Sequence, residues 1–143
     1  MMPDVVIKTG KEQMDLQTVH QFLSQESYWA KGIPFEMVAD ALSHSYCTGA
    51  FLDGQQIGFG RLITDYTTFA WFADFFVLPE YHGRGVAKQM LTHILSQPWT
   101  KRLRRKMLAT KDAHTLYEKF EFTALASPDR IMEIFQPDIH LHI

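Results

Sequence analysis

A glycine-containing loop between a predicted strand and a predicted helix is the part of this sequence best suited to chemistry. The apolar run 71–77 is typical of a strand, and Val86 begins a run typical of a helix. Gly83 and Gly85 lie between them and carry no Cβ to keep a ligand from the backbone. Because the first N–H groups of a helix have no partner within it, such a loop can hold a phosphate group. The same residues also fit a tight turn that binds nothing, and the loop alone does not separate the two interpretations.

Hydrophobic spacing along the chain predicts the elements that would position this loop. The predicted strands and helices alternate in an order typical of an α/β (α+β) domain, with a mixed, mostly antiparallel sheet flanked by about four helices. Asp53-Gly54 is a strong signal for a hairpin turn between two of the strands. The predicted strands cover 5–7, 46–52, 56–64, 69–78, 106–109, 122–125 and 131–135, and the predicted helices cover 11–25, 34–43, 86–96 and 113–120.

Length and composition restrict the class of protein. A chain of 143 residues fits a single domain, 1–143. A net charge of −2 does not indicate general binding to nucleic acid or to membrane surfaces. The basic run 101–106 is either a solvated loop or a site that attracts a polyanion. No apolar window is long enough to span a membrane, and no signal peptide is visible.

The cysteine and histidine content points away from disulfide and metal chemistry. Cys47 is the single cysteine, which excludes an intramolecular disulfide and predicts a cytosolic protein. Its apolar context predicts a buried thiol rather than a nucleophile. The seven histidines show no metal-binding spacing on a predicted helix, so we predict no metal site.

Two segments, in the right order, resemble the GNAT superfamily of acetyltransferases. Residues 77–87 resemble the family's Gln/Arg-x-x-Gly-x-Gly/Ala pattern, which follows a strand. Residues 113–122, Ala-His-Thr-Leu-Tyr-Glu-Lys-Phe-Glu-Phe, are similar to its Ala-x-x-Leu-Tyr-Glu-Lys-x-Gly-Phe segment. One predicted helix and one predicted strand separate the two, as in the family. The pair is much more specific than either part, and the resemblance implies a single GNAT-like domain.

The resemblance implies acetyl-CoA as the donor of an acetyl group. In the family, loop amides hold the pyrophosphate of the cofactor, and the backbone at the end of the preceding strand pairs with the pantetheine arm. The implied cofactor contacts are Phe76, Val77, Leu78, His82, Gly83, Arg84, Gly85, Val86, Ala87, Lys88 and Thr110.

Three residues depart from the family pattern. His82 stands where Gln or Arg is usual, and an imidazole can still form a hydrogen bond or carry charge. Thr110 stands where an Asn often contacts the pantetheine arm. Glu121 replaces a glycine that favours a positive φ at a helix end, so we expect strain there or a different ending.

Carry-over of the family's tyrosine makes Tyr117 the candidate general acid for the leaving thiolate, with a side chain merely packed on the sheet as the alternative. Asp74 lies alone in the apolar run 71–77, where a carboxylate is costly unless it is paired or faces a cleft. It is a candidate to accept the proton of the amine or to bind a cationic acceptor. The alternative is a structural Asp bonded to neighbouring backbone or to Arg61.

In the family the loop after the first helix flanks the acceptor side, so the resemblance implies that this loop, the predicted strand 56–64 and the turn after it could line the acceptor pocket. Candidates are Tyr28, Trp29, Arg61 and Asp65. Tyr28 and Trp29 alternatively cap the core, and Arg61 and Asp65 alternatively form a surface ion pair.

The sequence therefore predicts an N-acetyltransferase that moves an acetyl group from acetyl-CoA to a primary amine of a small molecule or peptide, by direct attack. The main alternative is a non-catalytic acyl-CoA-binding or sensing module on the same fold. A nucleotide-binding protein is a weaker alternative, since no Gly-Lys-Ser/Thr and no Gly-x-Gly-x-x-Gly is present. Family members often form homodimers, so the resemblance also suggests a second copy of the chain as a partner.

Overall fold

Runs of apolar residues build one five-stranded sheet in a computed structural model that describes residues 4–143. The first four strands pair antiparallel in chain order, and the fifth pairs parallel with the fourth. The prediction of a mixed, mostly antiparallel sheet is therefore confirmed. The strands are β1 (Val6–Thr9), β2 (Tyr46–Leu52), β3 (Gln55–Thr64), β4 (Phe69–Val77) and β5 (Arg105–Leu108).

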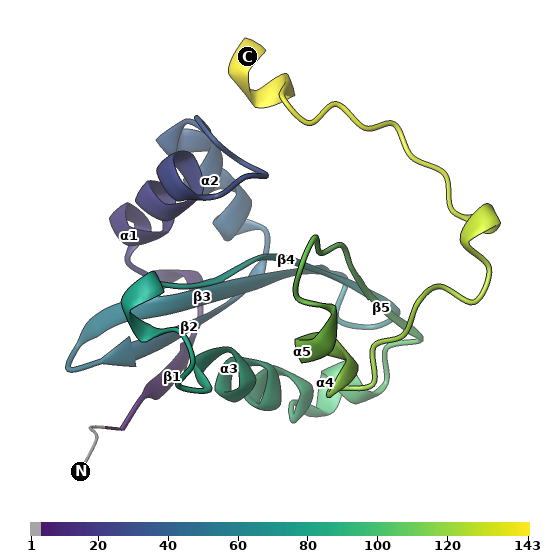
Figure 1. The fold of residues 1–143 in the computed structure, drawn as a ribbon, viewed down its shortest axis with the longest axis horizontal. Coiled ribbons are helices and arrows are strands. Elements are labelled where there is room, and N and C mark those ends of the chain that lie inside the picture. The colour runs from purple at the N-terminus through teal and green to yellow at the C-terminus, as the bar shows by residue number, and fades with distance from the viewer. Residues whose placement is uncertain (1–3) are drawn as a thin grey trace.

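Helices cover both faces of the sheet, with α1 and α2 on one face and α3 and α4 on the other (Figure 1). This explains why successive residues of β2 and β3 are buried without a break along most of each strand, since strands that are covered on both faces lose the alternation of buried and exposed residues. The helices are α1 (Leu16–Gln21), α2 (Phe35–Ser43), α3 (Val86–Leu95), α4 (Pro98–Lys101) and α5 (His114–Glu118).

The first predicted helix, 11–25, is divided into three pieces. A 3-10 turn covers Lys11–Gln13, α1 begins at Leu16, and a π-helical turn over Phe22–Glu26 ends the segment. The start at Leu16 follows from Asp15, whose carboxylate accepts a hydrogen bond from the N–H of Thr18 at 3.3 Å and caps the helix.

Two large buried clusters hold the layers together. Under α1 and α2, apolar side chains that include Leu23 and Leu42 pack against Phe59 of β3. On the opposite face, Leu91 and Ile94 of α3 pack in a second cluster that also contains Tyr117 of α5. The second cluster fixes α5 beside α3 and thereby sets the position of Tyr117.

The predicted closing strands 122–125 and 131–135 are not strands in this structure. After α5 the chain leaves the sheet as an extended C-terminal arm, residues 123–143, drawn in green to yellow in Figure 1. Alternating apolar residues predict a strand only where a sheet edge is available for pairing. Within the chain the arm turns away from the edge of β5, so the side chains of Met132 and Ile134 remain more than 90% exposed.

Candidate active site

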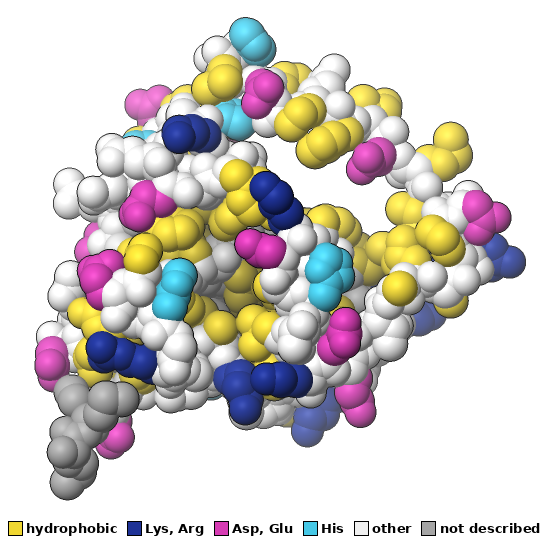
Figure 2. Space-filling model, in the orientation of Figure 1, with side chains coloured by type: hydrophobic (Ala, Val, Ile, Leu, Met, Phe, Trp, Pro, Cys, Tyr) yellow, Lys and Arg dark blue, Asp and Glu magenta, His cyan; other side chains and the backbone are white. Residues whose placement is uncertain are grey.

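The sheet opens where β4 and β5 stop pairing. Their pairing joins Phe69–Phe72 to Arg105–Leu108, and the remainder of β4, residues 73–77, has no partner on that side within residues 4–143. A cleft of about 430 Å³ lies at this opening. Its inner wall is apolar, with Met90 and Leu91 of α3 among the lining residues, and Figure 2 shows hydrophobic side chains gathered in the central hollow of the molecule.

A β-bulge in β4 accompanies this opening. Two residues, Asp74 and Phe75, stand opposite the single Gly60 of β3. Asp74 has a φ of 59°, and the ring of Phe75 lies over Gly60 so closely that a Cβ there would be 2.4 Å from it. A bulge bends its strand and redirects side chains, which accounts for the turn of β4 away from β5. Gly60 is required for this close approach.

The glycine loop has the geometry of an anion site. Gly83 and Gly85 have φ of 79° and 76°, and no other atom lies within 4 Å of the position that a Cβ would take on either residue. No side chain caps the start of α3, so its first N–H groups stay available to a ligand. Val86, Ala87 and Lys88 line the cleft together with the two glycines. The loop therefore presents backbone donors and a lysine to the cleft.

His82 ties this loop to the end of β4. Its ring N–H at Nε2 donates a hydrogen bond to the carbonyl of Val77 at 2.7 Å. The N–H of Leu78 donates to the carbonyl of Ile57 at 2.8 Å, so this donor is also in use. His82 therefore holds the loop against the end of β4. The carbonyl of Val77 and the N–H of Leu78 already have hydrogen-bond partners within the chain.

Tyr117 lines the cleft from α5 and is 9% exposed. Burial, and to a lesser extent the phenol of Tyr28, raise the pKa of Tyr117 to about 12. The ammonium of Lys111 lies 5.3 Å from the centre of the Tyr28 ring, so the loop between α1 and α2 contacts the loop before α5 at this point.

The end of α5 fixes the backbone of Tyr117. The N–H of Phe122 donates to the carbonyl of Tyr117 at 3.2 Å, and the N–H of Glu121 donates to the carbonyl of Glu118 at 3.1 Å. This is the Schellman pattern, in which the residue at the position of Glu121 takes a positive φ. Glu121 has a φ of 72°, so the expected strain is present at the point where the family pattern has glycine.

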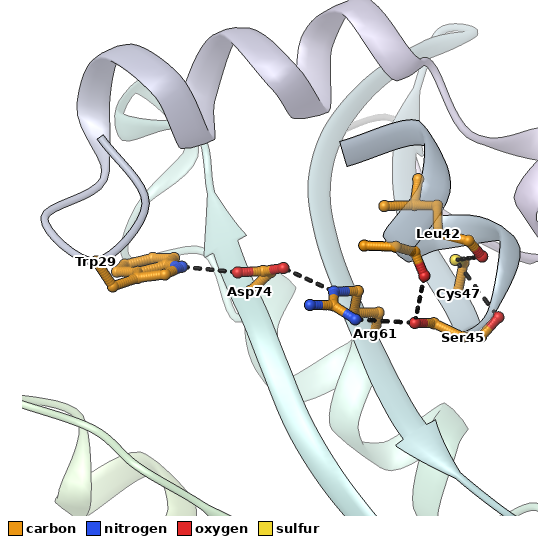
Figure 3. Close-up of polar contacts among 7 residues, drawn as sticks. Trp29, Leu42, Ser45, Cys47, Arg61 and Asp74 are labelled. Atoms are coloured by element: carbon orange, nitrogen blue, oxygen red, sulfur yellow. Dashed lines mark hydrogen bonds and ion pairs between the residues drawn. The ribbon is translucent and has the colours of Figure 1, made fainter. Parts of the chain in front are cut away.

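A chain of polar contacts runs from the loop between α1 and α2 to β2 (Figure 3). The indole N–H of Trp29 donates to one carboxylate oxygen of Asp74 at 2.7 Å, and Nε of Arg61 donates to the other oxygen at 2.7 Å. Arg61 also donates to the hydroxyl of Ser45 at 2.9 Å. The side chains of Asp74 and Arg61 are only 14% and 15% exposed. Arg61 therefore pairs with Asp74 rather than with Asp65.

The structure does not bring Asp65 together with the other candidate acceptor residues. Its carboxylate accepts hydrogen bonds from the hydroxyl of Thr68 at 2.6 Å and from the N–H groups of Thr67, Thr68 and Phe69 at 2.7–3.2 Å. These bonds, the Thr68 hydroxyl first, hold the pKa of Asp65 well below its ordinary value. The residue closes the turn between β3 and β4.

We expect Asp65→Ala to lower the melting temperature while leaving the KM for an amine unchanged, because the turn loses four hydrogen bonds and the cleft loses none. The depressed pKa means that this stabilisation is present above the pKa of an unfolded Asp and disappears as the pH falls through the lower, folded value. Thermal melts between pH 2 and pH 7 measure it, and the difference from wild type should shrink at the acid end. An altered amine KM with an unchanged melting temperature would return Asp65 to the acceptor site.

Most of the predicted cofactor residues share the cleft with Tyr117. Three of them, Leu78, Arg84 and Thr110, do not line it. The guanidinium of Arg84 lies over the ring of Tyr81, and the hydroxyl of Thr110 accepts a hydrogen bond from the N–H of Ala113 at 3.0 Å. The lining residues that sequence reasoning missed come from β4, from the apolar faces of α3 and α5, and from the segments that precede these helices. They are Phe75, Tyr81, Met90, Leu91, Asp112, Ala113 and Leu116.

Other chemistry finds little support in the described part of the chain. Burial raises the pKa of the Cys47 thiol to about 11, so the thiolate is disfavoured. Among residues 4–143, no three His, Cys, Asp or Glu side chains gather in a way that would hold a metal ion. None of the helices described here has the length and apolar character needed to cross a membrane.

Three comparisons with known proteins all find acetyltransferases. Residues 43–124 match the family model of the acetyltransferase (GNAT) domain. A Gibberella zeae protein named as a candidate acetyltransferase is 31% identical over 138 residues, covering 81% of this chain and 77% of that protein. A crystal structure of a candidate GNAT-family acetyltransferase from Xanthomonas campestris pv. campestris is 43% identical, with a TM-score of 0.94 over 98% of this chain and 99% of that one. A GNAT-family protein from Streptococcus pneumoniae, 24% identical, shares the fold with a TM-score of 0.73 over 93% and 98% of the chains. The chain belongs to the GNAT family of acetyltransferases.

Proposed function

We propose that this protein transfers the acetyl group of acetyl-CoA to a primary amine of a small molecule or peptide. The observation that carries the proposal is the shared cleft, in which the open amides of the glycine loop and the phenol of Tyr117 line the same walls. Asp74 directly precedes Phe75 of the cleft wall and accepts a hydrogen bond from Trp29, although neither Asp74 nor Trp29 lines the cleft itself. Donor and acceptor would then meet between the loop and this pair.

The residues present fit a CoA-type donor. Two glycines with open space at their Cβ positions leave room for a pyrophosphate against the backbone of 83–88. Arg84 and Lys88 add positive charge near the same amides. The apolar side chains of Met90, Leu91 and Leu116 offer contact area for the pantetheine arm. Bound there, acetyl-CoA supplies the activated thioester.

Direct transfer requires that the amine nitrogen bond to the thioester carbonyl carbon while the carbon–sulfur bond breaks and the sulfur keeps the electron pair. The phenol of Tyr117 would give its proton to that sulfur. With a phenol pKa of about 12 and an ordinary thiol pKa of about 8.5, this proton transfer is uphill by about 5 kcal/mol. Burial reduces this difference between the two pKa values, because the apolar cleft also raises the pKa of the CoA thiol.

Asp74 is the proposed residue for the incoming amine. Each carboxylate oxygen accepts one bond, from Trp29 or from Arg61, and each keeps a further lone pair for an amine N–H. The carboxylate would bind the amine as a cation and then accept its proton, directly or through water. Trp29 and Tyr28 would pack against the carbon skeleton of the acceptor.

We expect Asp74→Asn to lower kcat/KM for amines at least tenfold while the affinity for acetyl-CoA stays within twofold, because the charge is lost and the cofactor loop is untouched. Asn tolerates the φ of 59° found at this position, so the fold should persist. Steady-state kinetics with varied amine, alongside calorimetry with acetyl-CoA, measures both quantities. Trp29→Phe is the matched control, which removes one hydrogen bond to Asp74 but keeps the charge of the carboxylate. Its kcat/KM for amines should fall less than that of Asp74→Asn. Equal kinetics in wild type and Asp74→Asn would leave Asp74 with a structural role.

A non-catalytic acyl-CoA-binding or sensing module is the second candidate, favoured by the raised pKa of Tyr117, which weakens it as an acid. A thiol-release assay with acetyl-CoA and a panel of small amines, polyamines and peptide amines separates the two. The proposed function predicts release of CoA thiol that depends on at least one amine. Binding of acetyl-CoA without release for any amine would favour the module. The cytosolic location stays a prediction from composition.

A further inference from the structure

One aromatic ring closes the end of the cleft that lies farthest along β4 from the glycine loop. Strand β4 runs toward the loop, and its residues that line the cleft are Phe75, Phe76 and Val77. Phe75 is the first of the three, so it is the most distant from the loop along the strand. Directly before it the sheet is closed, because Phe72 and Leu108 form the last pair of β4 with β5. A group that follows β4 away from the loop therefore ends against Phe75.

The bulge in β4 directs this ring into the cleft. Side chains alternate between the faces of a strand, so Phe72 and Phe75 would lie on opposite faces of a regular strand. Because Asp74 and Phe75 together stand opposite Gly60, the alternation shifts by one residue. Phe75 accordingly packs in the same cluster as Phe72, whereas Phe76 belongs to the cluster under α1 and α2.

The ring of Phe75 has no room to retreat from the cleft. On the side of the sheet it lies over Gly60, so closely that a Cβ there would overlap it. Beside it lies the ring of Phe72, stacked at a centroid distance of 5.8 Å with an angle of 16° between the planes. The edge of Phe122 in turn contacts Phe72 at 5.3 Å and Tyr117 at 5.7 Å. This row of rings fixes the wall of the cleft from the bulge to the candidate acid.

The place of an acyl group follows from the two ends of the proposed cofactor. The loop amides would hold the pyrophosphate, and Tyr117 would meet the thioester sulfur. The acyl carbons lie beyond the sulfur from the pyrophosphate, so they would extend toward the closed end of the cleft. The carboxylate of Asp74 is held by Trp29 and Arg61 (Figure 3). The next residue, Phe75, is therefore the one that the end of an acyl chain would contact.

We propose that Phe75 restricts the donor to acyl-CoA with a short acyl chain such as acetyl, and that Gly60 positions the ring for this role. The proposal rests on the proposed function, since it requires an acyl-CoA in the cleft. An acetyl group ends before the ring, whereas each further methylene has to enter space that the ring fills. A single methylene in an apolar pocket changes the specificity of an enzyme by about 10- to 200-fold, and this wall cannot recede toward the sheet.

Calorimetric titration with CoA, acetyl-CoA and butyryl-CoA, without any amine, tests this wall independently of turnover. We expect wild type to bind butyryl-CoA about tenfold or more weakly than acetyl-CoA. Phe75→Ala should bind butyryl-CoA more tightly than acetyl-CoA, because two methylenes are then buried in the vacated space and each adds about fourfold. The affinity for CoA should stay within about twofold in the variant, since CoA has no acyl chain to meet the ring.

Phe75→Leu and Phe122→Leu form a matched pair of variants. Both rings are partly buried in the same cluster, but of the two only Phe75 lines the cleft. Phe75→Leu keeps an apolar side chain, so it should fold even if Phe75→Ala does not. With the best amine of the panel, we expect the kcat/KM for butyryl-CoA relative to acetyl-CoA to rise about tenfold or more in Phe75→Leu. The same ratio should change by less than about twofold in Phe122→Leu.

Gly60→Ala tests the position of the ring. The added Cβ would displace the ring of Phe75 from the sheet toward the cleft. We expect the affinity for acetyl-CoA to fall about tenfold while that for CoA is unchanged. Adding Phe75→Leu to Gly60→Ala should restore the affinity for acetyl-CoA, because the shorter side chain no longer reaches the acetyl group. An acetyl-CoA affinity that Gly60→Ala leaves unchanged would contradict the positioning role of Gly60.

The outcomes separate the role of Phe75 from the proposed function. A wild type that binds butyryl-CoA as tightly as acetyl-CoA would overturn this role while acetyl transfer stands. So would a selectivity in Phe75→Leu that equals that of wild type or of Phe122→Leu. A wild type that binds no acyl-CoA would overturn both proposals. If acetyl-CoA binds but no amine is acetylated, the catalytic function fails, and the affinities of the acyl-CoA series still decide the role of Phe75.

Discussion

Gly85→Glu should reduce the affinity for acetyl-CoA by more than a hundredfold. The Cβ of the variant would point into the open space that the proposal assigns to the pyrophosphate, and the carboxylate would repel it. The φ of 76° adds strain of about 1–2 kcal/mol for a residue other than glycine. Calorimetric titration with acetyl-CoA measures the loss directly.

Gly54→Glu is the control for the strain in that experiment. Gly54 lies in the turn between β2 and β3, has a φ of 79°, and likewise has nothing within 4 Å of its Cβ position. The two variants therefore share the same backbone cost and differ in whether the side chain enters the cleft. We expect Gly54→Glu to bind acetyl-CoA as wild type does. Normal binding by Gly85→Glu, or equal losses in both variants, would contradict the assignment of the loop.

Tyr117→Phe should lower kcat by one to two orders of magnitude while acetyl-CoA binding stays near wild type, which is the scale of help from a general acid. The variant removes one oxygen and keeps the ring that packs against Phe122. Tyr46→Phe, at a partly buried phenol in β2, is the control and should retain turnover. A Tyr117→Phe enzyme with the kcat of wild type would remove this phenol from the mechanism.

The pH profile supplies an independent test of the same role. A general acid acts while it is protonated, so its contribution falls as the pH rises through its pKa. Burial raises the pKa of Tyr117 to about 12, which moves any such fall in kcat above pH 11. A fall in kcat near pH 10 that Tyr117→Phe abolishes would show that the phenol is not shifted as the structure indicates.

The elements of the sheet and the glycine loop could be predicted from local patterns. Strand β2 was predicted with its observed bounds, and Gly83 and Gly85 have the positive φ for which glycine is suited. These features depend on residues close in sequence, where periodicity and backbone preference decide the outcome. The prediction of strands at 122–125 and 131–135 was wrong for the single chain, because strand formation needs an available edge and the arm leaves the one at β5.

The arrangement of the proposed acceptor residues was harder to predict because it depends on contacts across the sheet. The bulge at Asp74 and Phe75 has no local signal, although it determines which way the carboxylate points. Arg61 pairs with Asp74 on the neighbouring strand, whereas the carboxylate of Asp65 accepts hydrogen bonds from the turn that follows it. The apolar lining from Met90 and Leu91 was visible as one face of a helix, but the sequence did not show that this face borders the cleft.

The most direct test of the account follows the acetyl group itself. Wild type, Gly85→Glu and Tyr117→Phe are incubated with isotope-labelled acetyl-CoA and the best amine of the panel, and both products are measured over a single turnover. The account predicts one labelled acetyl-amine for each CoA thiol released by wild type, none from Gly85→Glu, and slow formation with the same stoichiometry from Tyr117→Phe. Release of CoA without an acetylated amine, or equal rates in all three proteins, would contradict it.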